Sequence, residues 1–136
     1  MIVYVLDSSA VLRYIDREIG ADRLISIFKA CVRQEDEARI SAVQWGEIAG
    51  NLRKKVGALR QRRILDSIIP YDLEIVPASA ERAVRAAELR VDRKIAYADA
   101  FALEVAMTSA DHVLITADYG FKAVTDLARI EFLPLK

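Results

Sequence analysis

Short apolar runs of strand length alternate along the chain with stretches in which apolar residues recur at helical spacing. The first run, residues 2–6, is apolar on both faces, which is typical of a central parallel strand covered by helices on both sides. Further strands are predicted at residues 38–41, 73–76, 112–116 and 129–133. Strands that alternate with helices pair in parallel through right-handed crossovers, so the pattern predicts an α/β fold, a three-layer α/β/α sandwich.

The segments between these strands carry helix signals. Asp7-Ser8-Ser9 offers three side chains that can cap the first helix. Ser41-x-x-Gln44 matches a capping box, and the helix that it opens is expected to break at Gly57 and resume to about residue 69. The clearest amphipathic helix is predicted from four apolar residues at helical spacing: Ala80, Val84, Ala87 and Val91.

Length and composition indicate one domain over residues 1–136, with 54% hydrophobic residues to form a core. The longest unbroken apolar run has six residues, whereas a membrane helix needs about 20 and a signal peptide about 7–15. Cys31 is the only cysteine, so an internal disulfide and a cysteine-rich zinc site are both excluded. We therefore expect a soluble, cytoplasmic protein that does not enter a membrane.

The charge distribution is more informative than the net charge. The 20 basic residues balance the 20 acidic ones, so the chain lacks the strongly basic character of many nucleic-acid-binding domains. Residues 53–63 nevertheless hold six basic side chains and no acid: Arg53, Lys54, Lys55, Arg60, Arg62 and Arg63. Such a stretch either keeps a helix pair solvated or forms a local positive field for a partner.

Four acids fall where an α/β sheet binds its ligands, at the carboxyl ends of the strands. Asp7 directly follows the first strand, and Asp118 comes two residues after the fourth. Glu47 lies in the second turn of the helix after the second strand, and Asp99 lies in the first turn of the helix that leads into the fourth. If the first and fourth strands are neighbours, all four carboxylates point into one crevice.

Each acid also has an ordinary interpretation. Asp7 and Asp99 can cap helices or be stabilised by the positive end of a helix dipole. Asp118 can be a turn residue, and Glu47 can be a solvated helix acid. Two carboxylates about 5 Å apart repel by roughly 3 kcal/mol at an effective dielectric near 20, so four that converge need protons or a cation. Oxygen ligands without histidine or cysteine suit Mg²⁺ or Mn²⁺. Ser8 and Thr116 lie next to these acids, where their hydroxyl groups can orient the metal ligands through hydrogen bonds.

The segments around these acids resemble the four acidic motifs of PIN-domain ribonucleases. They read Val-Leu-Asp-Ser-Ser-Ala at Asp7, Ile-Ser-Ala-Val-Gln-Trp-Gly-Glu at Glu47, Tyr-Ala-Asp-Ala-Phe-Ala-Leu at Asp99 and Leu-Ile-Thr-Ala-Asp-Tyr-Gly-Phe at Asp118. The chain is most similar to the short VapC-type toxins of prokaryotic toxin–antitoxin pairs. The resemblance covers essentially the whole chain, and Tyr97 departs from the glycine or serine that is common at its position.

The resemblance implies a five-stranded parallel sheet in the order 3-2-1-4-5 and metal-dependent endoribonuclease activity on single-stranded RNA. Asp7 and Asp99 would bind the primary Mg²⁺, and Asp118 would complete that site or a second one. Glu47 would orient a metal-bound water or act as the base. The family also implies a homodimer and a cognate antitoxin that threads the active-site groove. RNA or the antitoxin would contact the basic stretch, which holds Arg53, Lys54, Lys55 and Arg60.

Two other functions remain open from the residues. A PIN-like module could hold nucleic acid or a protein without cleaving it, although a module of this kind has no need to keep all four acids. Metal-dependent turnover separates this alternative from the nuclease. A nucleotide-binding α/β domain would need a glycine-rich loop to hold phosphates, and the sequence contains neither a G-x-G-x-x-G motif nor a Walker loop.

Overall fold

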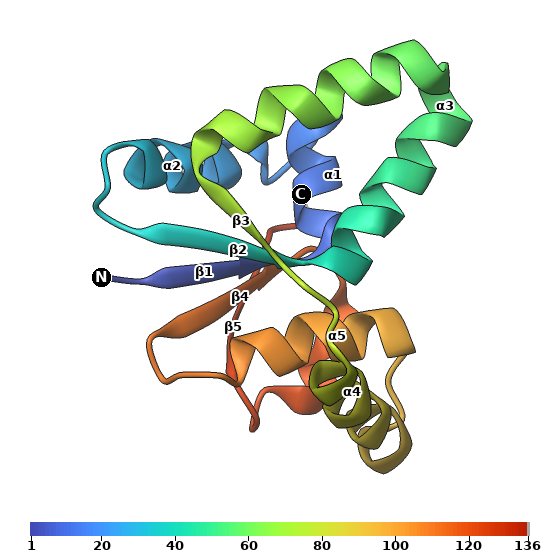
Figure 1. The fold of residues 1–136 in the computed structure, drawn as a ribbon. Coiled ribbons are helices and arrows are strands. Elements are labelled where there is room, and N and C mark those ends of the chain that lie inside the picture. The colour runs from blue at the N-terminus through green and yellow to red at the C-terminus, as the bar shows by residue number, and fades with distance from the viewer. Residues whose placement is uncertain (136) are drawn as a thin grey trace.

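The computed structural model describes residues 1–135 and contains a five-stranded, all-parallel sheet in the order β3-β2-β1-β4-β5 (Figure 1). This arrangement confirms the predicted fold class and strand order. The central strand β1 is buried along its whole length, as its unbroken apolar run predicts. The strands are β1 (Val3–Leu6), β2 (Glu37–Ser41), β3 (Leu73–Val76), β4 (His112–Thr116) and β5 (Arg129–Phe132).

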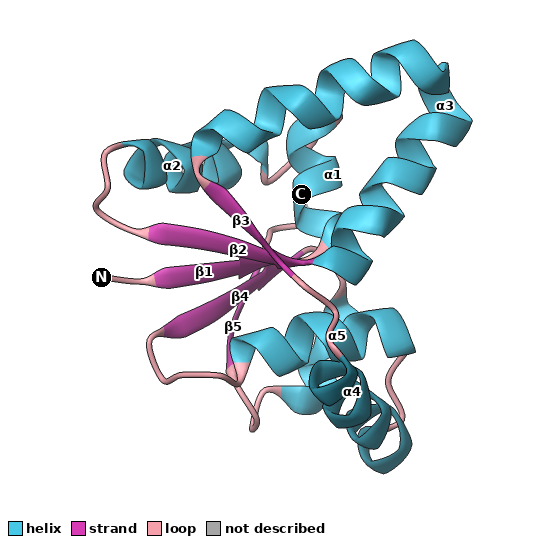
Figure 2. Ribbon diagram, in the orientation of Figure 1, coloured by secondary structure: helices cyan, strands magenta, loops and turns pink. Residues whose placement is uncertain are grey.

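Helices cover both faces of the sheet and produce three layers (Figure 2). One face packs against α1 (Ser8–Ile15), α2 (Ala21–Val32) and α3 (Ala42–Ile68), and the short helix η1 (Ile69–Tyr71) leads from α3 into β3. The other face packs against α5 (Tyr97–Ala106) and η2 (Tyr119–Val124), with α4 (Ala80–Arg93) packed on α5. Alternate residues of β1 therefore enter different cores, with Tyr4 and Leu6 in the first and Val5 in the second.

Helix α3 bends sharply at Gly57, where the sequence predicts a break. Gly57 has φ 81° and ψ 177°, a backbone conformation that is essentially restricted to glycine. The first half of α3 leads away from the end of β2, and the second half returns across α1 toward α2 and η1 (Figure 1). The bend thus brings the second half of α3 back over α1.

The predicted amphipathic helix forms as α4, but it presents its valine stripe to solvent. Val84 and Val91 are 60% and 74% exposed, whereas Ala86 on the opposite side of the helix is fully buried. An apolar stripe normally packs on the core. Here the inward side of α4 uses small residues and Leu89, because they pack closely against Phe101 of α5.

Among the strands that pair, β1 and β4 are the furthest apart in the chain. Leu6 pairs with Ile115, so Asp7 and Thr116 leave the carboxyl edge of the sheet side by side. The edge of the sheet therefore brings together Asp7 and the loop that carries Asp118. Within residues 1–135, none of the helices combines the length and the apolar character that a membrane crossing requires.

Candidate functional site

Asp7 caps α1 and is buried, with only 2% of its surface exposed. Its Oδ1 accepts hydrogen bonds from the backbone nitrogen of Ala10 at 2.9 Å and from Ser9 Oγ at 2.8 Å. Its Oδ2 accepts a hydrogen bond from Thr116 Oγ1 at 2.5 Å. The structural interpretation of Asp7 as a helix cap is therefore correct, and the same contacts fix its carboxylate at the carboxyl edge of the sheet.

Two hydroxyl groups join Asp7 to the loop after β4. Thr116 Oγ1 accepts a hydrogen bond from the backbone nitrogen of Asp118 at 2.9 Å, and Ser9 Oγ accepts one from the backbone nitrogen of Ala117 at 2.9 Å. Asp118 is exposed and caps η2, since its Oδ1 accepts a hydrogen bond from the backbone nitrogen of Gly120 at 2.8 Å. The loop geometry is thus set by hydroxyl groups and backbone amides, and none of these partners brings a positive charge to Asp7 or Asp118.

The other two acids come from helices on opposite faces of the sheet. Asp99 lies half-buried in the first turn of α5. Glu47 lies exposed in the second turn of α3, where its Oε1 accepts a hydrogen bond from Ser8 Oγ at 3.1 Å. Ser8 thus contacts Glu47, and Thr116 contacts Asp7, so each of these predicted supporting residues touches one of the acids.

The pKa values show how these acids interact. The pKa of Asp99 is raised to about 6, mainly by burial and then by the negative charges of Asp118, Asp7 and Glu47 in that order. Burial also raises the pKa of Asp7 to about 6, with a smaller contribution from Asp118, although hydrogen bonds from Thr116, Ala10 and Ser9 oppose the increase. The fold therefore brings Asp99 within electrostatic range of the other three acids.

The donor chemistry of this site suits a hard divalent cation. All four acids supply carboxylate oxygens, and in the ion pairs found among residues 1–135 none of the four has a Lys or Arg partner. Excess negative charge without counter-charge favours Mg²⁺ or Mn²⁺. In the described part of the chain, however, no three His, Cys, Asp or Glu side chains stand in an arrangement ready to hold a metal ion. The residues fit the cation chemically, and the coordination remains a prediction.

Two contributors to the site were missed by the sequence analysis. Ser9 was considered only as a helix cap, although its hydroxyl joins Asp7 to Ala117. Gln44 was assigned to a capping box with Ser41. Ser41 does cap α3, since its Oγ accepts a hydrogen bond from the backbone nitrogen of Val43 at 3.2 Å. Gln44 does not play the part that the capping box gives it. The Gln44 side chain is buried at the site and makes other contacts. A polar residue one turn before Glu47 on the same helix was the available signal.

The basic stretch lies at the bend of α3. Arg53, Lys54 and Lys55 end its first half, Arg60 begins its second half, and all four are exposed. Lys55 Nζ lies 3.5 Å from Asp16 Oδ2, so part of its charge is already matched within the chain. The remaining cations lie on the helix that also carries Glu47.

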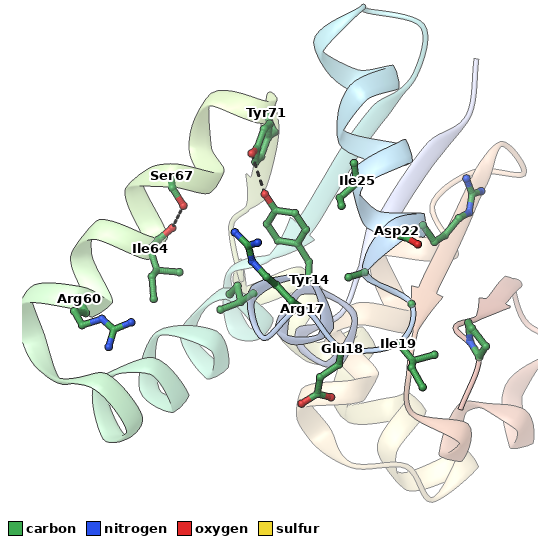
Figure 3. A pocket seen from close by; sticks show the side chains of 15 residues that line it. Tyr14, Arg17, Glu18, Ile19, Asp22, Ile25, Arg60, Ile64, Ser67 and Tyr71 are labelled. Carbon is green, nitrogen blue, oxygen red and sulfur yellow. Dashed lines mark hydrogen bonds between the residues drawn. The ribbon is translucent and has the colours of Figure 1, made fainter. Parts of the chain in front are cut away.

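A large cavity lies apart from the acids. It has a volume of about 1250 Å³ and lies between the end of α1, the start of α2 and the second half of α3. Tyr14 and Tyr71 meet at one end of it, where their hydroxyl oxygens are 2.9 Å apart, while Arg17 and Arg60 come from its two sides (Figure 3). None of the four acids lines this cavity. The molecule therefore carries an acidic edge and a separate, mixed apolar and charged groove.

Solved structures share this architecture across nearly the whole chain. The crystal structure of VapBC2 from Rickettsia felis bound to a promoter DNA fragment matches with a TM-score of 0.73 and 21% identity, covering 98% of this chain and 100% of that one. DNA-bound VapBC from Salmonella typhimurium matches with a TM-score of 0.72 and 16% identity, with 97% and 98% coverage. FitAcB from Neisseria gonorrhoeae matches with a TM-score of 0.66 and 22% identity, with 96% and 97% coverage. These matches establish a shared fold.

Sequence comparison identifies the family. A search of curated proteins found no match. The family model described as the PIN domain matches residues 4–127, a range that contains all four acids and, apart from Val3, every strand except the last. A match over this much of the chain means that the protein is a member of the PIN domain family.

Proposed function

We propose that this protein is a Mg²⁺- or Mn²⁺-dependent endoribonuclease that hydrolyses phosphodiester bonds of single-stranded RNA, and that it is the toxin of a toxin–antitoxin pair. The observation that carries the proposal is a group of four acids whose negative charges act on one another. None of the four forms an ion pair with a basic side chain in the described part of the chain. The PIN domain membership and the fold shared with VapBC structures support it.

The four acids would have different roles, and these roles follow from how deeply each acid is buried. Asp7 and Asp99, which are buried and half-buried, would hold the cation, and Asp118 would complete that site or a second one. When bound, the cation supplies charge neutralisation at the scissile phosphate and lowers the pKa of a bound water. Glu47 is exposed and would orient the attacking water or accept its proton.

The hydroxyl groups keep the acids in place. Thr116 donates to Asp7 Oδ2 and leaves the carboxylate its negative charge, and Ser8 donates to Glu47. A hydrogen bond to the charged form of a carboxylate favours that form, which is the form that binds a cation. Both hydroxyls therefore support a metal site without competing for it.

Two surfaces outside the group of acids suit macromolecular partners. Arg53, Lys54, Lys55 and Arg60 are exposed on α3 and would contact the phosphates of RNA or acidic groups of the antitoxin. The separate groove of about 1250 Å³ has apolar walls and charged side chains on both sides, which suits an amphipathic segment of the antitoxin. We place the protein in the cytoplasm, where both partners would be found.

A second copy of the chain suits the exposed stripe of α4. The stripe alternates two alanines with two valines, so two antiparallel copies that cross between Val84 and Ala87 set each valine against an alanine of the other copy. Exposed apolar side chains in a continuous stripe are more typical of an interface than of an open surface. A homodimer through α4 is therefore part of the proposal.

The function is tested by replacing single acids and measuring RNA cleavage with and without Mn²⁺. Asp7→Asn and Asp99→Asn are expected to lower the rate of cleavage by at least about 10²-fold, because each removes a metal ligand and a negative charge. Glu131→Gln is the matched control, since Glu131 pairs with Arg23 and makes none of the hydrogen bonds that hold the four acids. Full activity in either aspartate variant, or parent cleavage that ignores added metal, would contradict the proposal. A parent that does not cleave RNA with or without Mn²⁺ would favour a binding module without turnover.

A further inference from the structure

Gln44 connects segments that the four acids alone would push apart. It lies in the first turn of α3 and is fully buried. Its Oε1 accepts a hydrogen bond from the backbone nitrogen of Ser8 at 2.7 Å, and its Nε2 donates one to the carbonyl oxygen of Ala98 at 2.6 Å. A single carboxamide thus joins the N-terminal ends of α1, α3 and α5.

Both contacts of this carboxamide are one residue away from an acid. Ser8 directly follows Asp7, and Ala98 directly precedes Asp99. Glu47 lies three residues after Gln44, which places it on the same side of α3. Gln44 is therefore connected to three of the four acid-bearing segments, and the hydroxyls of Ser9 and Thr116 connect the fourth.

An uncharged connector is what this site needs. Carboxylates that share a field repel each other, and a lysine or arginine at position 44 would neutralise them by forming ion pairs. An amide offers both a donor and an acceptor without a net charge. It can thus hold two helix ends at a fixed spacing and still leave the carboxylates free for a cation.

We infer that Gln44 is a positioning residue of the proposed metal-dependent nuclease, which sets the spacing between the backbone segments that carry Asp7 and Asp99. The inference rests on the proposed function. Loss of the connector is expected to loosen that spacing without removing a ligand. A displacement of about 1 Å at reacting groups can reduce a rate about 10²-fold, and loss of a group that supports metal ligands can weaken metal affinity about 10–100-fold.

The test compares Gln44→Met with the parent in three measurements. Methionine keeps the length of the side chain and removes both hydrogen bonds. We expect faster hydrogen exchange at the Ser8 amide, Mn²⁺ binding weakened about 10-fold or more by calorimetry, and a lower kcat for RNA cleavage with little change in KM. A lower kcat without a change in KM would distinguish positioning from contact with RNA.

Gln61→Met is the matched control. Gln61 Nε2 donates to the carbonyl oxygen of Ala49 at 2.8 Å across the bend of α3, so the substitution also removes one glutamine hydrogen bond. It is expected to leave Mn²⁺ affinity and kcat unchanged. Gln44→Asn serves as a second variant if Gln44→Met does not fold, because asparagine stays polar and is too short to span both contacts. It is expected to give an intermediate loss of Mn²⁺ affinity.

The outcomes separate this inference from the proposed function. An active parent together with a folded Gln44 variant that binds Mn²⁺ and cleaves RNA equally well would overturn the role of Gln44 alone. Equal losses in the Gln44→Met and Gln61→Met variants would also overturn it, because the effect would then be general to the fold. A parent that neither binds Mn²⁺ nor cleaves RNA would overturn the proposed function and the role of Gln44 with it.

Discussion

The charged carboxylates of Asp7 and Asp99 destabilise the metal-free fold. Burial and the neighbouring acids raise the pKa of each to about 6, which means that the folded protein disfavours their charged forms. For Asp7, the increase from 3.8 to about 6 corresponds to a penalty of about 3 kcal/mol on the charged form. A site that destabilises the fold in this way is expected where function, rather than stability, determines the residues.

This cost predicts that Asp99→Asn stabilises the metal-free protein. Because Asp99 is only half-buried, solvent screening reduces the gain to about 1 kcal/mol, or about 3 °C in Tm for a chain of this size. Thermal unfolding near pH 8 with a chelator measures the gain. Added Mg²⁺ should then raise the Tm of the parent more than that of the variant, because a ligand stabilises the state that binds it. A variant that unfolds below the parent in chelator would disprove the electrostatic cost.

The same cost predicts a pH dependence with a definite sign. A carboxyl whose folded pKa is raised binds more protons in the folded state, so its contribution to stability falls as pH rises. For Asp7 and Asp99 the window runs from 3.8 to about 6. The advantage of Asp99→Asn in the free energy of unfolding should therefore be largest above pH 6 and nearly absent at pH 4. Urea titrations of both proteins across this range give the difference, and an advantage that grows toward acid would contradict the sign.

At the scale of elements, the bend in α3 depends on one glycine. The φ of 81° and ψ of 177° at Gly57 are accessible to glycine and strained for other residues, and a Cβ added there would meet no atom within 4 Å. Any cost of a side chain at this position is therefore backbone strain and not a steric clash. The path of the second half of α3 across α1, and the groove that it lines, depend on that conformation.

Two glycine substitutions in this helix are expected to have opposite signs. Gly57→Ala should lower the free energy of unfolding by about 1–3 kcal/mol through backbone strain. Gly50→Ala is the control, since Gly50 lies within α3, has no Cβ contact within 4 Å and should gain about 0.5–1 kcal/mol from alanine. Chemical denaturation of both variants measures the two effects. Equal effects at the two positions would show that the bend does not depend on the conformation of Gly57.

The elements themselves were largely predictable, and the exception is the orientation of α4. Strand positions, helix positions and the break at Gly57 follow from local signals that tertiary packing reinforces. The side of α4 that packs inward does not follow, because the small Ala86 fits closely against α5 while Val84 remains outside. Hydrophobicity alone favours the valines, and close packing between two helices favours the alanine.

At the scale of the whole molecule, the exposed stripe of α4 predicts the oligomeric state. Val84→Glu should convert a dimer into a monomer, because a charge would be buried between the two copies. The substitution should leave the fold intact, since Val84 is 60% exposed in the single chain. Leu59→Glu is the control, because Leu59 is 66% exposed on α3, outside the stripe. Sedimentation equilibrium distinguishes the species, and a parent that is monomeric at high concentration would exclude this interface.

The positions of the acids and the support from Ser8 and Thr116 were predictable from the sequence, and the contacts of Gln44 were not. Asp7 and Asp118 follow strands, so the parallel sheet by itself places them at one edge. The role of Gln44 depends on a side chain that reaches α1 and α5 from α3, contacts that span 36 and 54 residues of sequence. Local pattern contains no information about such distances, which is why a capping box was the natural interpretation.

The order of the strands also determines when the acidic edge can form during synthesis. β1 leaves the ribosome before the other strands, yet Thr116 at the end of its neighbour β4, which holds Asp7, comes 109 residues after that aspartate. A nascent chain therefore carries Asp7 without its Thr116 partner until β4 has been synthesised. Any hydrolytic activity of this protein would require that β4 has been made and paired with β1, and fragments that stop before β4 would be inert.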